Sequence, residues 1–373
     1  MGKSVVINIP RTGFHIKKQN GNFFSNRRSH MIITHVRAVQ PEADRAPAGW
    51  RGDIGQILVR INTDDGLSGY GVGGGGPAGI HVVQTVLREV LIGANAGDVE
   101  GLWDAMYRHT AAYGRKGIAM MAISGVDLAL WDLRGKRANK PLVEVLGGTR
   151  MAVPSYRTGW SRDDLEGALA LGYKALKYGI GGMDPHSELD AIADFFADVR
   201  SVVGNDIQLM CDASMGWDVE GTLRAADRLA EFNLDWLEEP LLPEDFGGYE
   251  RLMRESPIPI ASGEHEYTAR GFEALMQRGL HAIYQPDVCW CGGLTELVKI
   301  YALAKEYDVE VCPHRGGEVW ALHAIVALDP DPLAESGRPW MTWVRDQPQV
   351  LDGKMAPGEG PGFGVSFNDD LWE

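Results

Sequence analysis

Cysteine and long hydrophobic runs are both scarce in this chain of 373 residues. The four cysteines form no CxxC pair and lie in apolar or strand-like segments, so we expect buried, reduced thiols instead of disulfides. No stretch approaches the roughly 20 consecutive apolar residues of a membrane-spanning helix. The N-terminal region lacks the continuous apolar segment of a secretory signal. We therefore expect an intracellular, cytoplasmic protein.

Positive charge is also in short supply. The chain has 36 Lys and Arg against 51 Asp and Glu, which gives a net charge of −15. Such a surface repels polyanions, so nucleic acids and anionic membranes are excluded as partners. The hydrophobic fraction of 45% is enough for a large buried core, which excludes a disordered or fibrous chain.

Residues 1–30 differ from the rest because they contain six basic residues and no acidic one. We interpret 1–30 as a tag or leader outside the fold, with the native frame opening at Met31.

Residues 31–150 follow the pattern of an α+β domain. Alternating or β-rich segments predict strands at 32–39, 56–62 and 67–72, and apolar residues spaced by three and four predict helices at 80–91, 99–107 and 118–136. The four glycines 73–76 precede a proline and are expected to form a flexible loop.

Residues 151–340 alternate short apolar strands with amphipathic helices, which indicates βα units and a parallel sheet. Eight strands are predicted, at 153–156, 173–178, 207–212, 234–238, 258–263, 282–286, 309–313 and 333–335. No Gly-rich phosphate turn follows the first strand, so a (β/α) barrel fits better than a doubly wound sheet.

A titratable residue ends each of the last seven predicted strands. Neighbours in this series lie 21 to 35 residues apart, about one βα repeat. In a barrel the C-terminal ends of the strands surround one mouth, so these side chains should converge. The seven are Lys177, Asp212, Glu238, Glu264, Asp287, His314 and Glu335.

Three of these carboxylates, Asp212, Glu238 and Glu264, cannot share a small site as bare anions. A hard divalent cation resolves the repulsion, and the sequence therefore predicts one Mg²⁺ in the site. No histidine or cysteine is expected among the ligands, which argues against zinc. The neighbouring Glu239 should point away from Glu238, because side chains alternate along a strand.

Asp287 and His314 end neighbouring strands. A carboxylate bonded to one imidazole nitrogen raises the basicity of the other, so we predict that His314 is a general base oriented by Asp287. Lys177 is expected to stabilise a substrate carboxylate, and Glu335 to donate to it when protonated; Glu318 competes with Glu335 for that role.

A cation and a base in one mouth suit the removal of a proton α to a carboxylate, with the cation stabilising the enediolate. If the substrate carries a β-hydroxyl, it can leave as water. If a second base faces the other side, reprotonation there gives racemisation.

Several motifs, together with this ring, resemble the enolase superfamily, mandelate racemase subgroup. Within the subgroup the likeness is greatest to L-rhamnonate dehydratases. The motifs are SGVDLALWD at 124–132, SGEH at 262–265, QPDV at 285–288, WCGGLT at 290–295, PH at 313–314 and PGFGV at 361–365.

The resemblance implies a (β/α)₇β modified TIM barrel at 151–340, an N-terminal α+β capping domain at 31–150, and a C-terminal segment, 341–373, that returns to the capping domain. It also implies the three carboxylates as magnesium ligands and His314, paired with Asp287, as the base. After taking the α-proton, His314 could return it to the departing β-hydroxide, and the enol product would become a 2-keto-3-deoxy acid.

Departures from the family pattern bear on the substrate. Lys177 is followed by Tyr178 and Gly179, so the second lysine of the racemases' Lys-x-Lys is missing, which favours dehydration. Ser214 stands where many relatives have a substrate-binding Asn. With Ser214, the predicted substrate-binding residues are His265 and Arg51.

We therefore predict a Mg²⁺-dependent dehydratase of an acid sugar, such as a five- or six-carbon aldonate. A cycloisomerase or epimerase of the same fold is the first alternative, and a non-catalytic scaffold is the second. The expected partners are a small-molecule sugar acid and, by family habit, further copies of the chain in a homo-oligomer.

Overall fold

The computed structural model describes residues 31–41, 55–315, 319–336, 341 and 343–372. The leader predicted at 1–30, and the candidate residues Arg51 and Glu318, lie outside these ranges. Met31–Glu373 forms one compact unit. Within the described part of the chain, no helix has the length and apolar character needed to cross a membrane.

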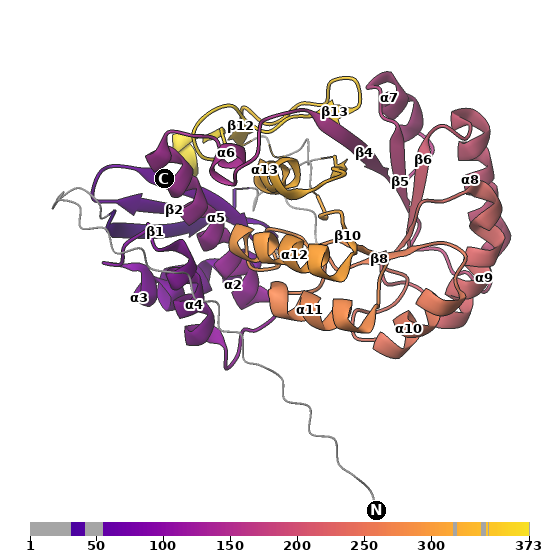
Figure 1. Cartoon of the computed structure of the whole chain (residues 1–373), viewed down its shortest axis with the longest axis horizontal. Helices are drawn as coiled ribbons and strands as arrows, with labels where there is room; N and C mark the ends of the chain where they lie inside the picture. Colours follow the sequence, from indigo (N-terminus) through magenta and orange to yellow (C-terminus); the bar gives the residue numbers. More distant parts are fainter. Residues whose placement is uncertain (1–30, 42–54, 316–318, 337–340, 342, 373) are drawn as a thin grey trace, which may run out of the picture. The chain divides into compact units, whose positions relative to one another are not determined.

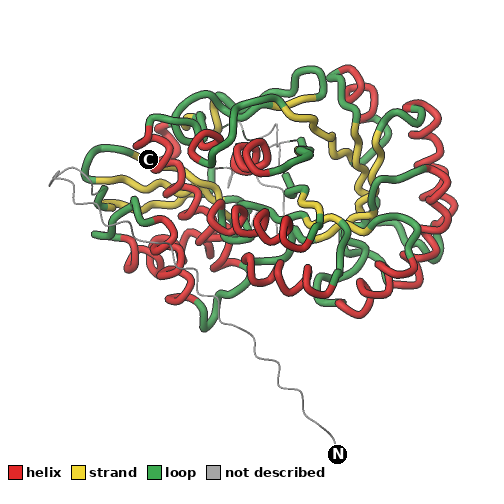
Figure 2. The backbone as a smooth tube through the Cα atoms, viewed as in Figure 1, coloured by secondary structure: helices red, strands yellow, loops and turns green. Residues whose placement is uncertain are grey.

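An antiparallel sheet of three strands opens the fold, in the order β1 (Ile33–Val39), β2 (Ile57–Thr63) and β3 (Ser68–Gly73) (Figures 1 and 2). A tight turn joins β2 to β3, with the backbone N–H of Thr63 donating to Leu67 O at 3.0 Å. The three strands predicted from alternation are present to within about one residue.

Helices follow this sheet: α2 (Gly76–His81), the π-helix η1 (Val82–Leu87), α3 (Arg88–Leu91), α4 (Val99–Thr110), α5 (Ile118–Ala138) and α6 (Leu142–Val145). The glycines 73–76 are not the flexible loop that was expected. Gly73 ends β3, Gly76 begins α2, and all four glycines are buried.

Glycines in β3 let the backbone of α5 approach the sheet closely. A Cβ on Gly69, Gly71 or Gly73 would lie 2.2–2.3 Å from a backbone oxygen of α5, at Ala129, Gly125 or Met121. Real Cβ atoms essentially never come so close. These alternate positions therefore have no side chain because the helix occupies that space.

Eight parallel strands build the second layer in the order β10-β9-β8-β7-β6-β5-β4-β11. They are β4 (Val153–Gly159), β5 (Ala175–Gly179), β6 (Gln208–Asp212), β7 (Leu237–Glu238), β8 (Ile260–Ser262), β9 (Ile283–Tyr284), β10 (Glu310–Val311) and β11 (Ala334–Glu335). All eight predicted strands are confirmed, and several are shorter than predicted.

Helices alternate with these strands and lie outside them (Figures 1 and 2). They are α7 (Asp164–Ala170), α8 (Leu189–Val203), α9 (Val219–Leu229) with the 3₁₀ turn η2 (Ala230–Phe232), α10 (Phe246–Glu255), α11 (Thr268–Arg278), α12 (Leu294–Tyr307) and α13 (Val319–Leu328). The predicted fold class, a modified TIM barrel with an N-terminal antiparallel sheet, is confirmed.

An apolar layer fills the interior of the barrel below the mouth. Its members come from seven strands or their immediate ends: Tyr156, Ala175, Met210, Trp236, Ala261, Ile283 and Cys312. Two residues further along each strand, the side chains again point inward, because the period of a strand is two. Those positions carry Thr158, Lys177, Asp212, Glu238, Gly263, Gln285 and His314. All four cysteines are buried and free, which confirms the expected thiols.

The last part of the chain contacts both the barrel and helix α5. It contains β12 (Val344–Arg345), β13 (Lys354–Met355), β14 (Ser366–Phe367) and the 3₁₀ turn η3 (Asp369–Trp372). Strand β13 pairs antiparallel with β4, and Phe363 N donates to Asp132 Oδ1 of α5 at 3.1 Å. The domain boundaries assigned from the sequence at 150 and 340 stay a prediction.

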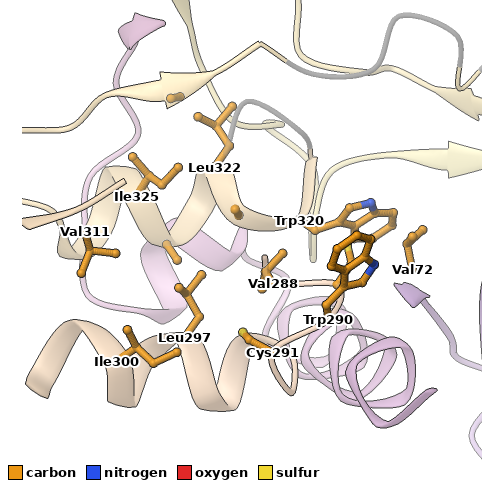
Figure 3. Close-up of a cluster of buried hydrophobic side chains, with 14 of the residues drawn as sticks. Val72, Val288, Trp290, Cys291, Leu297, Ile300, Val311, Trp320, Leu322 and Ile325 are labelled. Atoms are coloured by element: carbon orange, nitrogen blue, oxygen red, sulfur yellow. The ribbon is translucent and has the colours of Figure 1, made fainter. Parts of the chain in front are cut away.

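Helix α5 also binds the turn between β9 and α12. Asp127 accepts from Thr295 N at 2.9 Å and from Thr295 Oγ1 at 2.5 Å. Ser124 Oγ accepts from Gly292 N at 2.9 Å, and Trp131 Nε1 donates to Thr295 Oγ1 at 2.9 Å. Apolar side chains of this turn pack in the same cluster as α12 and α13 (Figure 3). Hydrogen bonds to α5 and apolar packing against α12 and α13 thus hold the turn in place.

The close approach of β3 to α5 predicts the effect of one methyl group. Gly71→Ala should lower the free energy of unfolding by about 1–3 kcal/mol or more, because the new Cβ meets backbone atoms that cannot rotate away. Gly247→Ala in α10 is the matched control. Nothing lies within 4 Å of its Cβ, so the change should be neutral or stabilise by up to about 1 kcal/mol. Urea unfolding of both variants checks this, and equal stabilities would contradict it.

Candidate functional site

Lys177 lies at the centre of the mouth, surrounded by carboxylates. Its Nζ bonds to Glu238 Oε1 and lies 3.2 Å from Glu335 Oε1 and 3.9 Å from Asp212 Oδ2, while only 1% of the side chain is exposed. Burial opposes the charge, but the three carboxylates outweigh it and hold the pKa of Lys177 well above its usual range. Lys177, expected to meet a substrate carboxylate, contacts carboxylates of the protein itself.

Glu238 is fully engaged by its neighbours. Its Oε2 accepts from Trp236 Nε1 at 2.9 Å and from Gln285 Nε2 at 2.7 Å, and its other oxygen meets Lys177. Burial and, after it, the charge of Asp212 raise the pKa of Glu238 to about 7, although Lys177 opposes the rise. Burial thus weakens the preference of this carboxylate for its ionised form.

The pKa of Glu335 is shifted in the opposite direction to that of Glu238. Thr158 Oγ1 and the backbone N–H of Arg315 each donate to it at 2.5 Å. Burial would raise its pKa, but Lys177 and His314 outweigh burial and hold the pKa at about 2. Glu335 is thus ionised at neutral pH and accepts hydrogen bonds. Its expected role as a donor to a substrate carboxylate stays a prediction.

Asp212 and Ser214 form a short local pair. The backbone N–H and the hydroxyl of Ser214 lie 2.8 and 3.1 Å from Asp212 Oδ1. Ser214 adopts a positive φ of 47°, which turns the chain back toward the carboxylate. Its hydroxyl, predicted to bind substrate, is therefore bonded to a predicted metal ligand.

Glu239, Glu264 and His265 form a second cluster beside Glu238. His265 Nδ1 lies 2.9 Å from Glu239 Oε2, and His265 Nε2 lies 3.6 Å from Glu264 Oε1. One possible ligand atom from each residue lies within 4.8 Å of the others. Glu239 contacts different groups from Glu238, and its membership in this cluster was missed. A histidine, His265, is thus among the possible ligands, and the expectation of carboxylate ligands alone stays a prediction.

His314 and Asp287 form the pair that was predicted. His314 Nδ1 lies 3.0 Å from Asp287 Oδ2, and Asp287 Oδ1 accepts from Cys289 N at 2.8 Å. The second nitrogen, His314 Nε2, lies 3.1 Å from Glu264 Oε2. Burial and the neighbouring Arg315 lower the pKa of His314, which favours the neutral imidazole. A neutral imidazole oriented by a carboxylate can accept a proton.

Trp290 and Arg315 complete the same side of the mouth, and neither was predicted as a site residue. The Trp290 ring centre lies 5.7 Å from that of His265 and 6.0 Å from that of His314. The Arg315 guanidinium lies 5.2 Å from the Trp290 ring centre. The signal was present in the sequence, because Trp290 follows the strand-end Asp287 by three residues and Arg315 follows His314 directly.

The carboxylates carry more negative charge than the protein compensates. Burial raises the pKa of Asp212 and Glu238, and burial together with Glu239 raises that of Glu264 well above its usual range. Oxygen ligands in such a number suit Mg²⁺, which prefers carboxylates and water. Ligand atoms of Glu239, Glu264 and His265 lie close enough together to hold a metal ion, and the ligand set of Asp212, Glu238 and Glu264 stays a prediction.

Taken together, an acidic mouth at the C-terminal ends of barrel strands and a His–Asp pair define a barrel enzyme that handles protons beside a cation. The protein families that match the chain support this class. The enolase C-terminal domain-like family matches residues 160–371, and the mandelate racemase/muconate lactonizing enzyme N-terminal domain matches residues 34–147. The chain belongs to the enolase superfamily, in the mandelate racemase and muconate lactonizing enzyme subgroup.

Relatives of this chain differ in the reactions for which they are named. L-rhamnonate dehydratase of Saccharopolyspora erythraea is 38% identical over 94% of each chain. A racemase from Streptomyces coelicolor A3(2), solved with bound magnesium, is 33% identical with a TM-score of 0.82 and covers 91% of this chain and 98% of its own. The 3,6-anhydro-D-galactonate cycloisomerase of Zobellia galactanivorans is 31% identical, with a TM-score of 0.79 over 91% and 98%.

The raised carboxylate pKa values predict how Mg²⁺ stabilises the protein. The pKa of Glu238 rises from 4.5 to about 7 on folding, so the metal-free protein loses stability as pH rises through that window. Mg²⁺ competes with those protons, so the increase in Tm on adding Mg²⁺ should grow from about pH 5 to about pH 8. Thermal unfolding with and without Mg²⁺ measures it.

Glu238→Gln should abolish most of this Mg²⁺-dependent increase, whereas Glu244→Gln, at an exposed position, should leave it unchanged. An increase that is the same at every pH, or that survives in Glu238→Gln, would contradict the carboxylate assignment.

Proposed function

We propose that this protein is a Mg²⁺-dependent dehydratase of an acid sugar, with an aldonate such as L-rhamnonate as its substrate. The reaction removes the proton α to the carboxylate and the β-hydroxyl, and it yields water and a 2-keto-3-deoxy acid. The observation that carries the proposal is the pair of His314 and Asp287, whose second imidazole nitrogen, Nε2, lies 3.1 Å from Glu264 Oε2 in the acidic mouth.

His314 serves as the base in this scheme. Asp287 holds Nδ1, so Nε2 receives the α-proton, and the imidazolium that forms is stabilised by the same carboxylate. The bond from the β-carbon to its oxygen then breaks, and His314 returns the proton to the departing hydroxide, so that water leaves. The enol that remains tautomerises to the ketone.

The Mg²⁺ ion would be held by Asp212, Glu238 and Glu264, and Glu239 stands next to them as a further oxygen donor. When bound, it supplies positive charge that stabilises the enediolate. Lys177, buried among Glu238, Glu335 and Asp212, keeps these carboxylates together and partly neutralised.

Dehydration is favoured over epimerisation because, among the described residues, β5 offers no second base. Lys177 is buried and paired, and Gly179, two residues later on β5, has no side chain. Epimerisation needs a proton donor on each face of the substrate carbon. Cycloisomerisation needs only one base and a leaving group, so it remains the second candidate, supported by the likeness to the anhydro-galactonate enzyme.

The proposal is tested by incubating the protein with Mg²⁺ and a panel of aldonates and aldarates. We expect at least one acid to lose water and give a 2-keto-3-deoxy acid, detected by mass spectrometry and by a colour reaction for that product. His314→Asn should lower kcat by at least about 100-fold, because it removes the only proposed base.

A second His–Asp pair on the surface supplies the matched control. His186 Nε2 lies 2.9 Å from Asp218 Oδ1 at an exposed position, so His186→Asn should retain full activity. A product isomeric with its substrate would support the cycloisomerase instead. Stabilisation by Mg²⁺ without turnover of any acid would support the non-catalytic scaffold.

A further inference from the structure

An exposed tryptophan stands at the rim of the mouth. Trp160 follows directly after β4, and 62% of its surface is exposed. Its ring lies against Gly179, the last residue of β5. A Cβ on Gly179 would lie 2.2 Å from Trp160 Cζ3 and 2.3 Å from Cε3. The indole thus occupies the space that any side chain at position 179 would need.

Strand register places this pair beside the predicted metal ligands. Gly159 is level with Tyr178, Gly179 with Asp212, and Asp212 with Glu238. The ring that covers Gly179 is therefore about one strand spacing, roughly 5 Å, from the position of Asp212. Tyr156 and Thr158 point into the barrel, and Trp160 is the next residue in this series of alternate positions. Its side chain therefore lies on the mouth side of the polar layer.

The backbone of Trp160 is fixed although its ring is exposed. Its N–H donates to Asp164 Oδ2 at 3.2 Å, at the start of α7. A single exposed hydrophobic residue is common on protein surfaces. This one differs because the neighbouring strand carries a glycine next to the ring: three ring carbons lie within 2.9 Å of the position that a Cβ of residue 179 would take, while most of the residue stays exposed.

We propose that Trp160 is a specificity-determining residue, whose exposed indole ring packs against the carbon chain of an acid sugar held in the mouth. The inference rests on the proposed function. The C–H groups of a polyol chain are weakly positive, and the face of an indole is negative, so the two surfaces attract while the hydroxyls stay available to polar groups. The same ring keeps any second base out of position 179.

Binding measured without turnover tests the proposal. In the His314→Asn background with Mg²⁺, calorimetry gives the Kd of L-rhamnonate, a six-carbon acid, and of D-glycerate, which lacks the distal carbons. Adding Trp160→Ala should weaken L-rhamnonate binding by about five- to tenfold and change D-glycerate binding less than about twofold. Trp160→Phe should retain most of the affinity, because it keeps an aromatic face.

Gly179→Ala provides an independent variant, because its new Cβ must push the ring away. It should weaken L-rhamnonate binding as Trp160→Ala does, and the double variant should be no weaker than Trp160→Ala alone. Leu351→Ala is the control. This residue is 75% exposed and belongs to the segment that pairs with the opposite end of β4, so its removal should change neither Kd.

The outcomes separate this inference from the proposed function. Equal losses for both acids, or no loss, would overturn the role of Trp160 even if the wild-type protein dehydrates an acid. Binding that depends on Trp160 without any turnover by the wild-type protein would support the role of Trp160 and overturn the proposed dehydratase activity. If no acid of the panel binds, both are overturned.

Discussion

Repulsion among buried carboxylates is the constraint on which this structure depends. Asp212, Glu238 and Glu335 surround one ammonium group, that of Lys177, and Glu264 lies beyond its contacts. An apolar layer beneath them keeps water away from below, which strengthens every one of these charges. The protein therefore holds negative charge in a place where only protons or a cation can complete the neutralisation. Such an incomplete balance favours the binding of a cation.

The barrel satisfies this constraint through a simple repeat. Six strands place an apolar residue in the interior and, two positions later, a polar one at the mouth, as Met210 and Asp212 or Trp236 and Glu238 illustrate. Eight strands of similar register then gather groups that are distant in sequence. The same repeat supplies both the stability of the core and the charge of the site, so the two cannot be altered independently at these positions.

Much of this arrangement could be predicted because strands obey a period of two and barrels have one catalytic end. The strands, the barrel and the converging of Lys177, Asp212 and Glu238 follow from those rules. The contacts of Glu239 could not be predicted, because its positive φ of 39° ends the alternation that the rule assumes. The buried glycines 73–76 were misjudged for a related reason: their conformation depends on α5, which lies nearly 50 residues away.

The hydrogen bonds between α5 and the turn after β9 have a consequence for folding kinetics. Ser124 to Gly292 and Asp127 to Thr295 each span 168 residues, so they close a very long loop. Contacts of such sequence separation form slowly, because the entropy of closing the loop must be lost before they stabilise anything. We therefore expect the turn that carries Asp287 to reach its final geometry late in refolding, after α5 has docked and after the barrel helices have formed.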